Sequence, residues 1–139
     1  MTKEAIELEI KKLNQKIRIS KSRISDYRNK IKKLEEGYSK SNKLNKSFHG
    51  YIDNYYSSVF SRIQRLDRDS AFGSYYSSKI NSIFKGKEMT EIESAISKGK
   101  KDIIRQIDDC ETQINYENRN IQQYKARIQE YQKQLMIFE

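Results

Sequence analysis

The sequence contains no proline and no tryptophan, one cysteine and five glycines among 139 residues. Because proline and glycine are the residues that most often interrupt helices, their scarcity predicts long, unbroken helical segments. The single cysteine, Cys110, excludes an internal disulfide. No apolar run approaches the roughly 20 residues of a membrane-spanning helix, so we expect no membrane span.

The start of the chain also lacks the pattern of a secretory signal peptide, since its first apolar residues lie among lysine and glutamate. We therefore expect a cytoplasmic protein. Export together with a partner, by a route that reads no cleaved signal peptide, stays open.

Apolar residues make up only 35% of the chain, whereas charged residues make up 34%. A compact globular domain usually has about 45–50% apolar residues. An elongated helical protein needs fewer, because each helix buries only a narrow stripe. The same composition is found in disordered chains. Ten tyrosines, five phenylalanines and a sustained apolar rhythm argue against disorder here.

Two stretches of the sequence repeat apolar residues at alternating steps of three and four, the spacing of a coiled-coil seam. In the first arm the seam positions are Ile6, Ile10, Leu13, Ile17, Ser20, Ile24, Tyr27, Ile31, Leu34 and Tyr38. In the last arm they are Ile92, Ile96, Gly99, Ile103, Ile107, Cys110, Ile114, Glu117, Ile121, Tyr124, Ile128, Tyr131, Leu135 and Phe138. Thr90 and Glu93 have the spacing of a capping box, which predicts a helix start there or a restart after Gly86.

Two heptad arms in one chain can pair antiparallel, and their irregular positions predict the register. Aligning residues whose numbers sum to about 137 places Ser20 opposite Glu117, so that the two polar seam positions share one layer. The same alignment matches large side chains with small ones. The matched pairs are Tyr38 with Gly99 and Tyr27 with Cys110.

We predict an all-α protein: a single elongated domain, residues 1–139, folded as an antiparallel helical hairpin with arms 3–66 and 73–138. The turn is placed at residues 67–72, where the sequence is rich in turn-forming residues. Gly50 and Gly86 lie opposite each other in this register, which predicts a bend or short break. The alternative is that residues 48–88 fold back as a small helical head on a coiled-coil stalk.

No group of residues in the sequence predicts catalysis. His49, the only histidine, has no metal-ligand spacing apart from Asp53, and we interpret it as a solvent-side residue. Cys110 lies on the seam, where a buried cysteine acts as a small hydrophobe. Phosphate loops, nucleophile motifs and paired carboxylates in an apolar setting are also missing from the sequence. We expect a protein that is not an enzyme and has no cofactor or metal site.

The net charge of +9 is concentrated in the first arm, because residues 1–47 hold 14 Lys/Arg against 6 Asp/Glu. Such an excess attracts nucleic acid, anionic lipid or an acidic protein. Sequence-specific nucleic-acid readers carry a recognisable docking unit, which this sequence does not have. Acidic residues also interleave with the basic ones, so nucleic acid ranks below a protein partner here.

Residues 48–84 hold more aromatic side chains than one seam can cover. Tyr51, Tyr56 and Tyr75 fall off the seam pattern. Tyrosine is favoured at interfaces because it offers apolar area with a polar tip. These rings therefore predict either a partner-binding surface or a compact head that closes on itself.

Several short motifs resemble those of small α-helical targeting proteins, WXG-like or associated with LXG toxins, of the type VIIb secretion system. Phe48-His49-Gly50 and Phe84-Lys85-Gly86 resemble W-x-G with phenylalanine in place of tryptophan. Phe84 and Glu88 resemble the F-x-x-x-[D/E] pattern associated with recognition by the export machinery. The resemblance implies a helical hairpin that binds the helical N-terminal domain of an LXG toxin and acts as a chaperone-like factor for its export.

The resulting hypothesis is a non-catalytic adaptor that binds a helical protein partner, a toxin N-terminal domain or a second small helical protein. The expected partner-binding residues are Tyr51, Tyr56, Tyr75, Phe84, Gly86 and Glu88. Two alternatives stay open: a structural coiled-coil spacer or oligomerisation module, and a basic helical nucleic-acid-binding protein. Homo- and hetero-oligomers are both compatible with the sequence.

Overall fold

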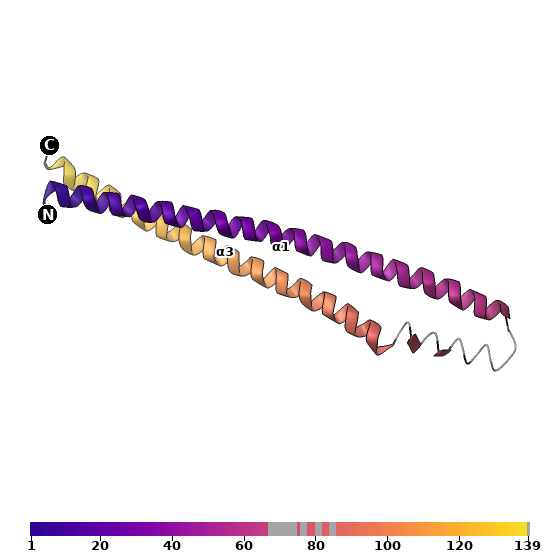
Figure 1. The fold of residues 1–139 in the computed structure, drawn as a ribbon. Helices are drawn as coiled ribbons and strands as arrows, with labels where there is room; N and C mark the ends of the chain where they lie inside the picture. Colours follow the sequence, from indigo (N-terminus) through magenta and orange to yellow (C-terminus); the bar gives the residue numbers. More distant parts are fainter. Residues whose placement is uncertain (67–74, 76–77, 80–81, 84–85, 139) are drawn as a thin grey trace. The chain divides into compact units, whose positions relative to one another are not determined.

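The computed structural model describes residues 1–66, 75, 78–79, 82–83 and 86–138, with the side chains of 63–66 and 87–88 left out. Within them lie two long helices, α1 (Lys3–Leu66) and α3 (Lys87–Met136) (Figure 1). The two helices pack against each other, and the chain is an all-α helical hairpin, as the heptad pattern predicts. The two ends of the chain lie side by side (Figure 1).

The first helix begins with an N-terminal cap at Thr2, which the sequence pattern did not predict. The Thr2 hydroxyl accepts a hydrogen bond of 3.1 Å from the backbone N–H of Ala5. This bond satisfies one of the donors that a helix N-terminus leaves without a partner. The sequence signal for this cap is weak. A full capping box has glutamate or glutamine three residues after the threonine, and here that position is Ala5.

The second helix begins one turn earlier than the predicted capping box. Gly86 forms a bend and α3 starts at Lys87. The backbone N–H and the hydroxyl of Thr90 both donate to the Gly86 carbonyl, each at 3.3 Å. Thr90 therefore lies inside α3, where it donates hydrogen bonds to the carbonyl four residues earlier. The prediction that Thr90 caps the start of the helix was wrong. The predicted restart after Gly86 is confirmed.

The chain divides into two compact units, each containing a segment of both helices. Unit 1 consists of residues 1–35 and 105–139, and unit 2 consists of residues 36–104. Their cores differ, because the buried residues that the structure describes all lie in unit 1.

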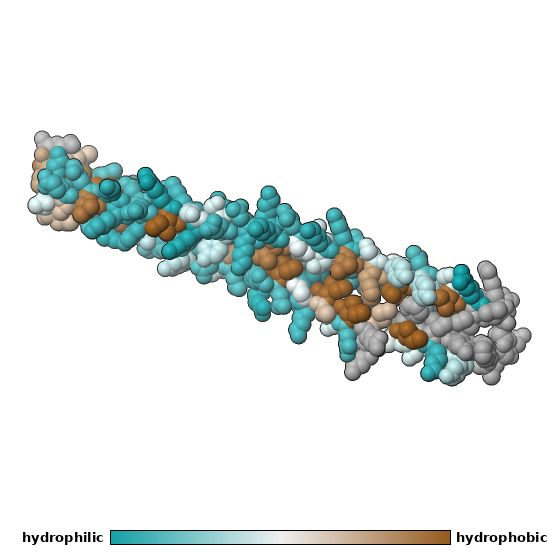
Figure 2. Space-filling model, viewed as in Figure 1, coloured by the Kyte–Doolittle hydropathy of each residue, from teal (hydrophilic) through white to brown (hydrophobic). Residues whose placement is uncertain are grey.

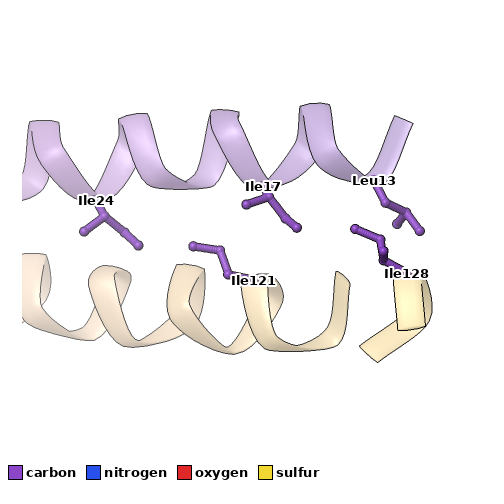
Figure 3. Packing of buried hydrophobic residues seen from close by; sticks show 5 residues of the cluster. All are labelled: Leu13, Ile17, Ile24, Ile121 and Ile128. Atoms are coloured by element: carbon purple, nitrogen blue, oxygen red, sulfur yellow. The ribbon is translucent and has the colours of Figure 1, made fainter. Parts of the chain in front are cut away.

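Unit 1 has a mainly apolar seam between α1 and α3. Its buried side chains point toward one another from the two helices (Figure 3). Burying each such side chain contributes about 1.5–3 kcal/mol, so this seam is the main source of stability in unit 1. The central cluster consists of Leu13, Ile17, Ile24, Ile121 and Ile128, with Ile10, Ile114, Tyr124 and Tyr131 packed partly buried against it.

One polar layer interrupts this seam at the place that the register predicts. Ser20 and Glu117 are only 3% and 4% exposed. Arg23 lies about one turn after Ser20, and its Nη1 atom approaches Glu117 Oε1 at 3.4 Å. Contact between these residues places the Ser20 turn of α1 beside Glu117. Tyr27 and Cys110 line one small hollow, which agrees with the same register.

Unit 2 keeps the antiparallel arrangement but packs more loosely. Lys100 Nζ lies 5.2 Å from the centre of the Tyr38 ring. Gly99 is exposed, and a Cβ atom added there would meet no atom within 4 Å, so the predicted packing of Tyr38 on Gly99 was wrong. Among the described residues of unit 2 none is fully buried. The chain places Ser41 and Asn45 at inward positions, and polar side chains there gain little from burial.

Helix α1 continues through Gly50 to Leu66. The bend predicted at Gly50 was therefore wrong, whereas the bend at Gly86 is found. The first half of residues 48–88 extends α1 instead of folding back as a head. The predicted arm 3–66 agrees with α1, while the predicted turn at residues 67–72 lies outside the described residues.

Substitutions at three glycines test whether α1 and α3 continue through Gly50 and Gly99 and whether the chain bends at Gly86. In an exposed helix interior, replacing glycine with alanine stabilises by about 0.8–1 kcal/mol. Gly50 and Gly99 lie inside α1 and α3 with open space around them, so each alanine variant should gain about that amount. A Cβ atom at Gly86 would instead collide with the backbone carbonyl of Ser82, so Gly86→Ala should destabilise the protein.

Chemical denaturation followed by circular dichroism measures these changes in the free energy of unfolding. A stabilising Gly86→Ala variant would contradict the close approach to Ser82.

None of the described helices is long and apolar enough to cross a membrane.

Candidate partner-binding surface

The most exposed aromatic feature among the described residues of unit 2 is a pair of stacked tyrosines on α1. The Tyr51 and Tyr55 ring centres are 6.2 Å apart and the ring planes differ by 8°. Their exposed fractions are 68% and 52%. Spacing of four residues places both rings on one face of the helix. The pair therefore presents a flat aromatic surface to solvent.

Leu44 extends this surface along α1. It lies seven residues before Tyr51, hence on the same face, and is 63% exposed. We name the three residues Leu44, Tyr51 and Tyr55 the lateral stripe. The visible face of unit 2 shows hydrophobic side chains among polar ones (Figure 2). Exposed apolar residues that are grouped in this way commonly mark interaction sites.

Positive charge borders the lateral stripe. Lys40 and Arg62 fall on the same helix face, one before Leu44 and the other after Tyr55. No aspartate or glutamate occurs between Gly37 and Ile52. The stripe therefore combines apolar and aromatic area with a basic border.

Tyr55 and Tyr56 lie on the opposite sides of α1 from those predicted by continuing the heptad spacing past Tyr38, which places Tyr55 inward and Tyr56 off the seam. Tyr55 is exposed, whereas Tyr56 is half-buried and stacks on Phe60 at 5.6 Å between ring centres. The half-buried residues Ile52, Tyr56 and Phe60 recur every four residues. An α-helix drifts by about 20° per heptad relative to a strict 3.5-residue repeat. The heptad spacing continued beyond Tyr38 does not include this drift, and it therefore exchanges the sides of Tyr55 and Tyr56.

The other expected partner-binding residues are spread along the chain. Tyr75 is exposed, and Lys79 Nζ lies 5.7 Å from the centre of its ring. Gly86 forms the half-exposed bend before α3, and Glu88 lies in the first turn of α3. Phe84 lies outside the described residues, so the arrangement of the F-x-x-x-E pattern is not tested.

His49 bridges the two helices of unit 2. Its Nδ1 atom lies 3.6 Å from Glu93 Oε1, and its ring meets Phe48 edge-on with 6.0 Å between ring centres. Both side chains remain about half exposed, so the pair contributes little to stability. The predicted solvent-side position of His49 agrees with this exposure, whereas the pairing with Glu93 was not predicted, because local spacing cannot reveal a partner far along the chain.

The described residues offer no metal-binding group of three or more His, Cys, Asp or Glu side chains. Cys110 is buried on the seam of unit 1, as its position predicts. A buried thiol among apolar side chains is a poor nucleophile. The lateral stripe is therefore the candidate partner-binding surface of unit 2.

Comparison of the chain with protein-family models, with curated proteins and with solved structures finds no match.

Proposed function

We propose that the protein is a non-catalytic adaptor that binds an amphipathic helix of a protein partner along the lateral stripe. The observation that carries this proposal is the exposed stack of Tyr51 and Tyr55 on α1. Tyrosine at an interface buries a large area while ordering only two side-chain torsions.

The spacing of the lateral stripe suits a helical partner. Leu44, Tyr51 and Tyr55 follow one another along about 16 Å of helix. A helix laid against this line can place side chains between the three anchors, in the way that helices dock on other helices. The rings already stack on each other, so less conformational freedom is lost when a partner binds.

The charges beside the stripe restrict the partner further. Lys40 and Arg62 on the same face favour a helix with apolar anchors flanked by aspartate or glutamate. Combined with the sequence resemblance stated above, this chemistry leads us to propose the N-terminal helical domain of an LXG toxin as the partner. The protein then acts as a chaperone-like targeting factor for type VII secretion, exported with that partner or released before export.

Substitution within the stripe tests this function. The protein encoded beside this chain, if it carries a helical N-terminal domain, is the partner to co-express and to titrate by calorimetry. The double variant Tyr51→Ser/Tyr55→Ser should weaken binding at least about tenfold, because aromatic anchors commonly contribute more than 1.4 kcal/mol each. Leu44→Ser should weaken it as well.

Tyr116 supplies the matched control, because it is 57% exposed but lies on α3 of unit 1. Tyr116→Ser should leave the affinity unchanged. Equal affinities for the wild type and the stripe variants would refute the assignment of this surface. Self-association of the purified protein without any dedicated partner would instead support a coiled-coil spacer.

A further inference from the structure

We propose that unit 1 binds the phosphate backbone of double-stranded nucleic acid, without sequence preference, through a basic hollow beside its seam. This activity uses a different part of the molecule from the lateral stripe. It does not depend on the adaptor function.

The hollow lies between α1 and α3 and has a volume of about 500 Å³. Lys21 and Arg28 reach it from α1, and Lys125 reaches it from α3. Asn29 and Asn118 add side-chain amides, which can donate hydrogen bonds to phosphate oxygens. Its lining thus combines three cations with neutral donors on two helices.

No aspartate or glutamate among the described residues lines this hollow. Three other hollows formed by described residues each contain a carboxylate. These carboxylates are Glu7, Glu93 and Asp109. The basic hollow therefore combines the charge sign and the donor groups that an anion requires.

On the side of α1 that faces the hollow, no carboxylate interrupts the cations between Arg18 and Lys32, and Glu35 follows one turn after Lys32. Between residues 16 and 33, eight lysines and arginines accompany a single acidic residue, Asp26. Arg18 and Lys32 continue the line of Lys21 and Arg28 along one side of α1, while Asp26 falls on another side. Glu111 is the acidic residue of α3 on the hollow's side, about two turns before Asn118.

These cations are available to a ligand. Arg18, Lys21, Arg28 and Lys32 are all exposed, and none of them forms an ion pair with another described residue. The line from Arg18 to Lys32 is about 20 Å long, and a duplex of that length carries about twelve phosphate charges. Neutralising several of them releases counterions, which is the main driving force of non-specific binding.

The lining of the hollow presents no exposed apolar side chain, which favours a duplex over other anions. Ile24 and Ile121 form the floor of the hollow but are buried, so they offer an amphipathic helix little apolar area. Leu8 and Ile19, which are exposed, fall on a different side of α1. A helix that binds a membrane surface needs such residues beside its basic ones. The lining also lacks aromatic rings, on which single-stranded bases would stack.

Fluorescence anisotropy with a labelled DNA duplex of about 20 base pairs, titrated with the full chain at several salt concentrations, tests the proposal. The hollow variant carries Lys21→Gln, Arg28→Gln and Lys125→Gln. A matched variant carries Lys30→Gln, Lys33→Gln and Arg119→Gln, which removes the same charge from other sides of the two helices. Circular dichroism checks that both variants keep the helical content and melting temperature of the wild type.

We expect micromolar binding at about 50 mM salt, weakened at least about tenfold in the hollow variant and less than about threefold in the matched variant. The slope of log affinity against log salt should also fall by about 2.7 in the hollow variant, because about three phosphate contacts are lost. Equal weakening in both variants would overturn the site. So would undetectable binding to the duplex, or tighter binding to phosphatidylcholine vesicles containing about one-third phosphatidylserine.

Discussion

Replacing Leu13 with alanine should lower the free energy of unfolding by about 2–3 kcal/mol. Leu13 is 2% exposed and packs within the cluster of Ile17, Ile24, Ile121 and Ile128. Truncating leucine in a core removes transfer free energy and leaves a cavity, with losses of about 2–5 kcal/mol in larger proteins. We expect the lower part of that range, because a seam between two helices can relax more easily than a core enclosed on all sides.

Leu8 provides the same substitution as a control within the same helix and the same unit. It is 52% exposed, so Leu8→Ala should change the free energy of unfolding by less than about 0.5 kcal/mol. Urea denaturation at several protein concentrations measures both variants and reveals any contribution from self-association. If Leu8→Ala and Leu13→Ala cost the same, the seam would not follow the register described above.

The agreement between sequence and structure is best where the heptad repeat is strictest. In unit 1 the repeat determines which side of each helix is apolar, and the defects at Ser20 and Glu117 determine how the helices align. A lone polar layer specifies register because misaligned pairing would place each polar group against apolar side chains. The contact between Arg23 and Glu117 agrees with this alignment. Both pieces of information are local and can be read from a single sequence.

The sequence predictions fail where the position of a side chain depends on contacts with a distant part of the chain. Beyond Tyr38 the inward positions carry the polar residues Ser41 and Asn45. The apolar pattern there no longer shows which side of α1 faces α3. Tyr55 and Tyr56 differ by only one position, and a small drift exchanges their environments. The pairing of His49 with Glu93 depends on how the two helices of unit 2 are placed and has no signal in either segment alone.

The candidate partner-binding surface was only partly predictable for the same reason. Tyr51 was identified correctly as lying off the seam, because aromatic residues exceeded the available inward positions. Continuing the heptad spacing past Tyr38 predicts inward positions for Leu44 and Tyr55, but both are exposed and form the lateral stripe with Tyr51. An excess of apolar residues can be counted from sequence, but which of them are left outside depends on the packing.

Glu117 offers the second stability test with a large expected effect, and here the change should be favourable. Replacing Glu117 with leucine should raise the free energy of unfolding by about 1–3 kcal/mol. The carboxylate is buried, its Oε1 atom contacts Arg23 at 3.4 Å, and its Oε2 atom has no hydrogen-bond partner in the described structure. The free energy lost by burying this charge exceeds the free energy gained from its contact with Arg23, whose side chain is mostly exposed. Leucine at this seam position removes that penalty and adds apolar contacts.

Two controls separate charge removal from general effects of a new leucine. Glu111→Leu changes an exposed glutamate of the same helix and should shift the free energy of unfolding by less than about 0.5 kcal/mol. Arg23→Gln should destabilise the wild type slightly, because Glu117 then loses its cation, but should have no effect in the Glu117→Leu background. A loss of stability in Glu117→Leu would mean that the polar layer contributes net stability.

The gain in stability should be accompanied by a loss of specificity. With Ser20→Leu added to Glu117→Leu, every layer of the unit 1 seam becomes apolar, and alternative registers or intermolecular pairings no longer bury a charge. Analytical ultracentrifugation should then detect oligomers of the double variant at concentrations where the wild type gives a single species. If the double variant keeps the mass distribution of the wild type, the Ser20–Glu117 layer does not select the pairing, and the register depends on the large-to-small matches such as Tyr27 with Cys110.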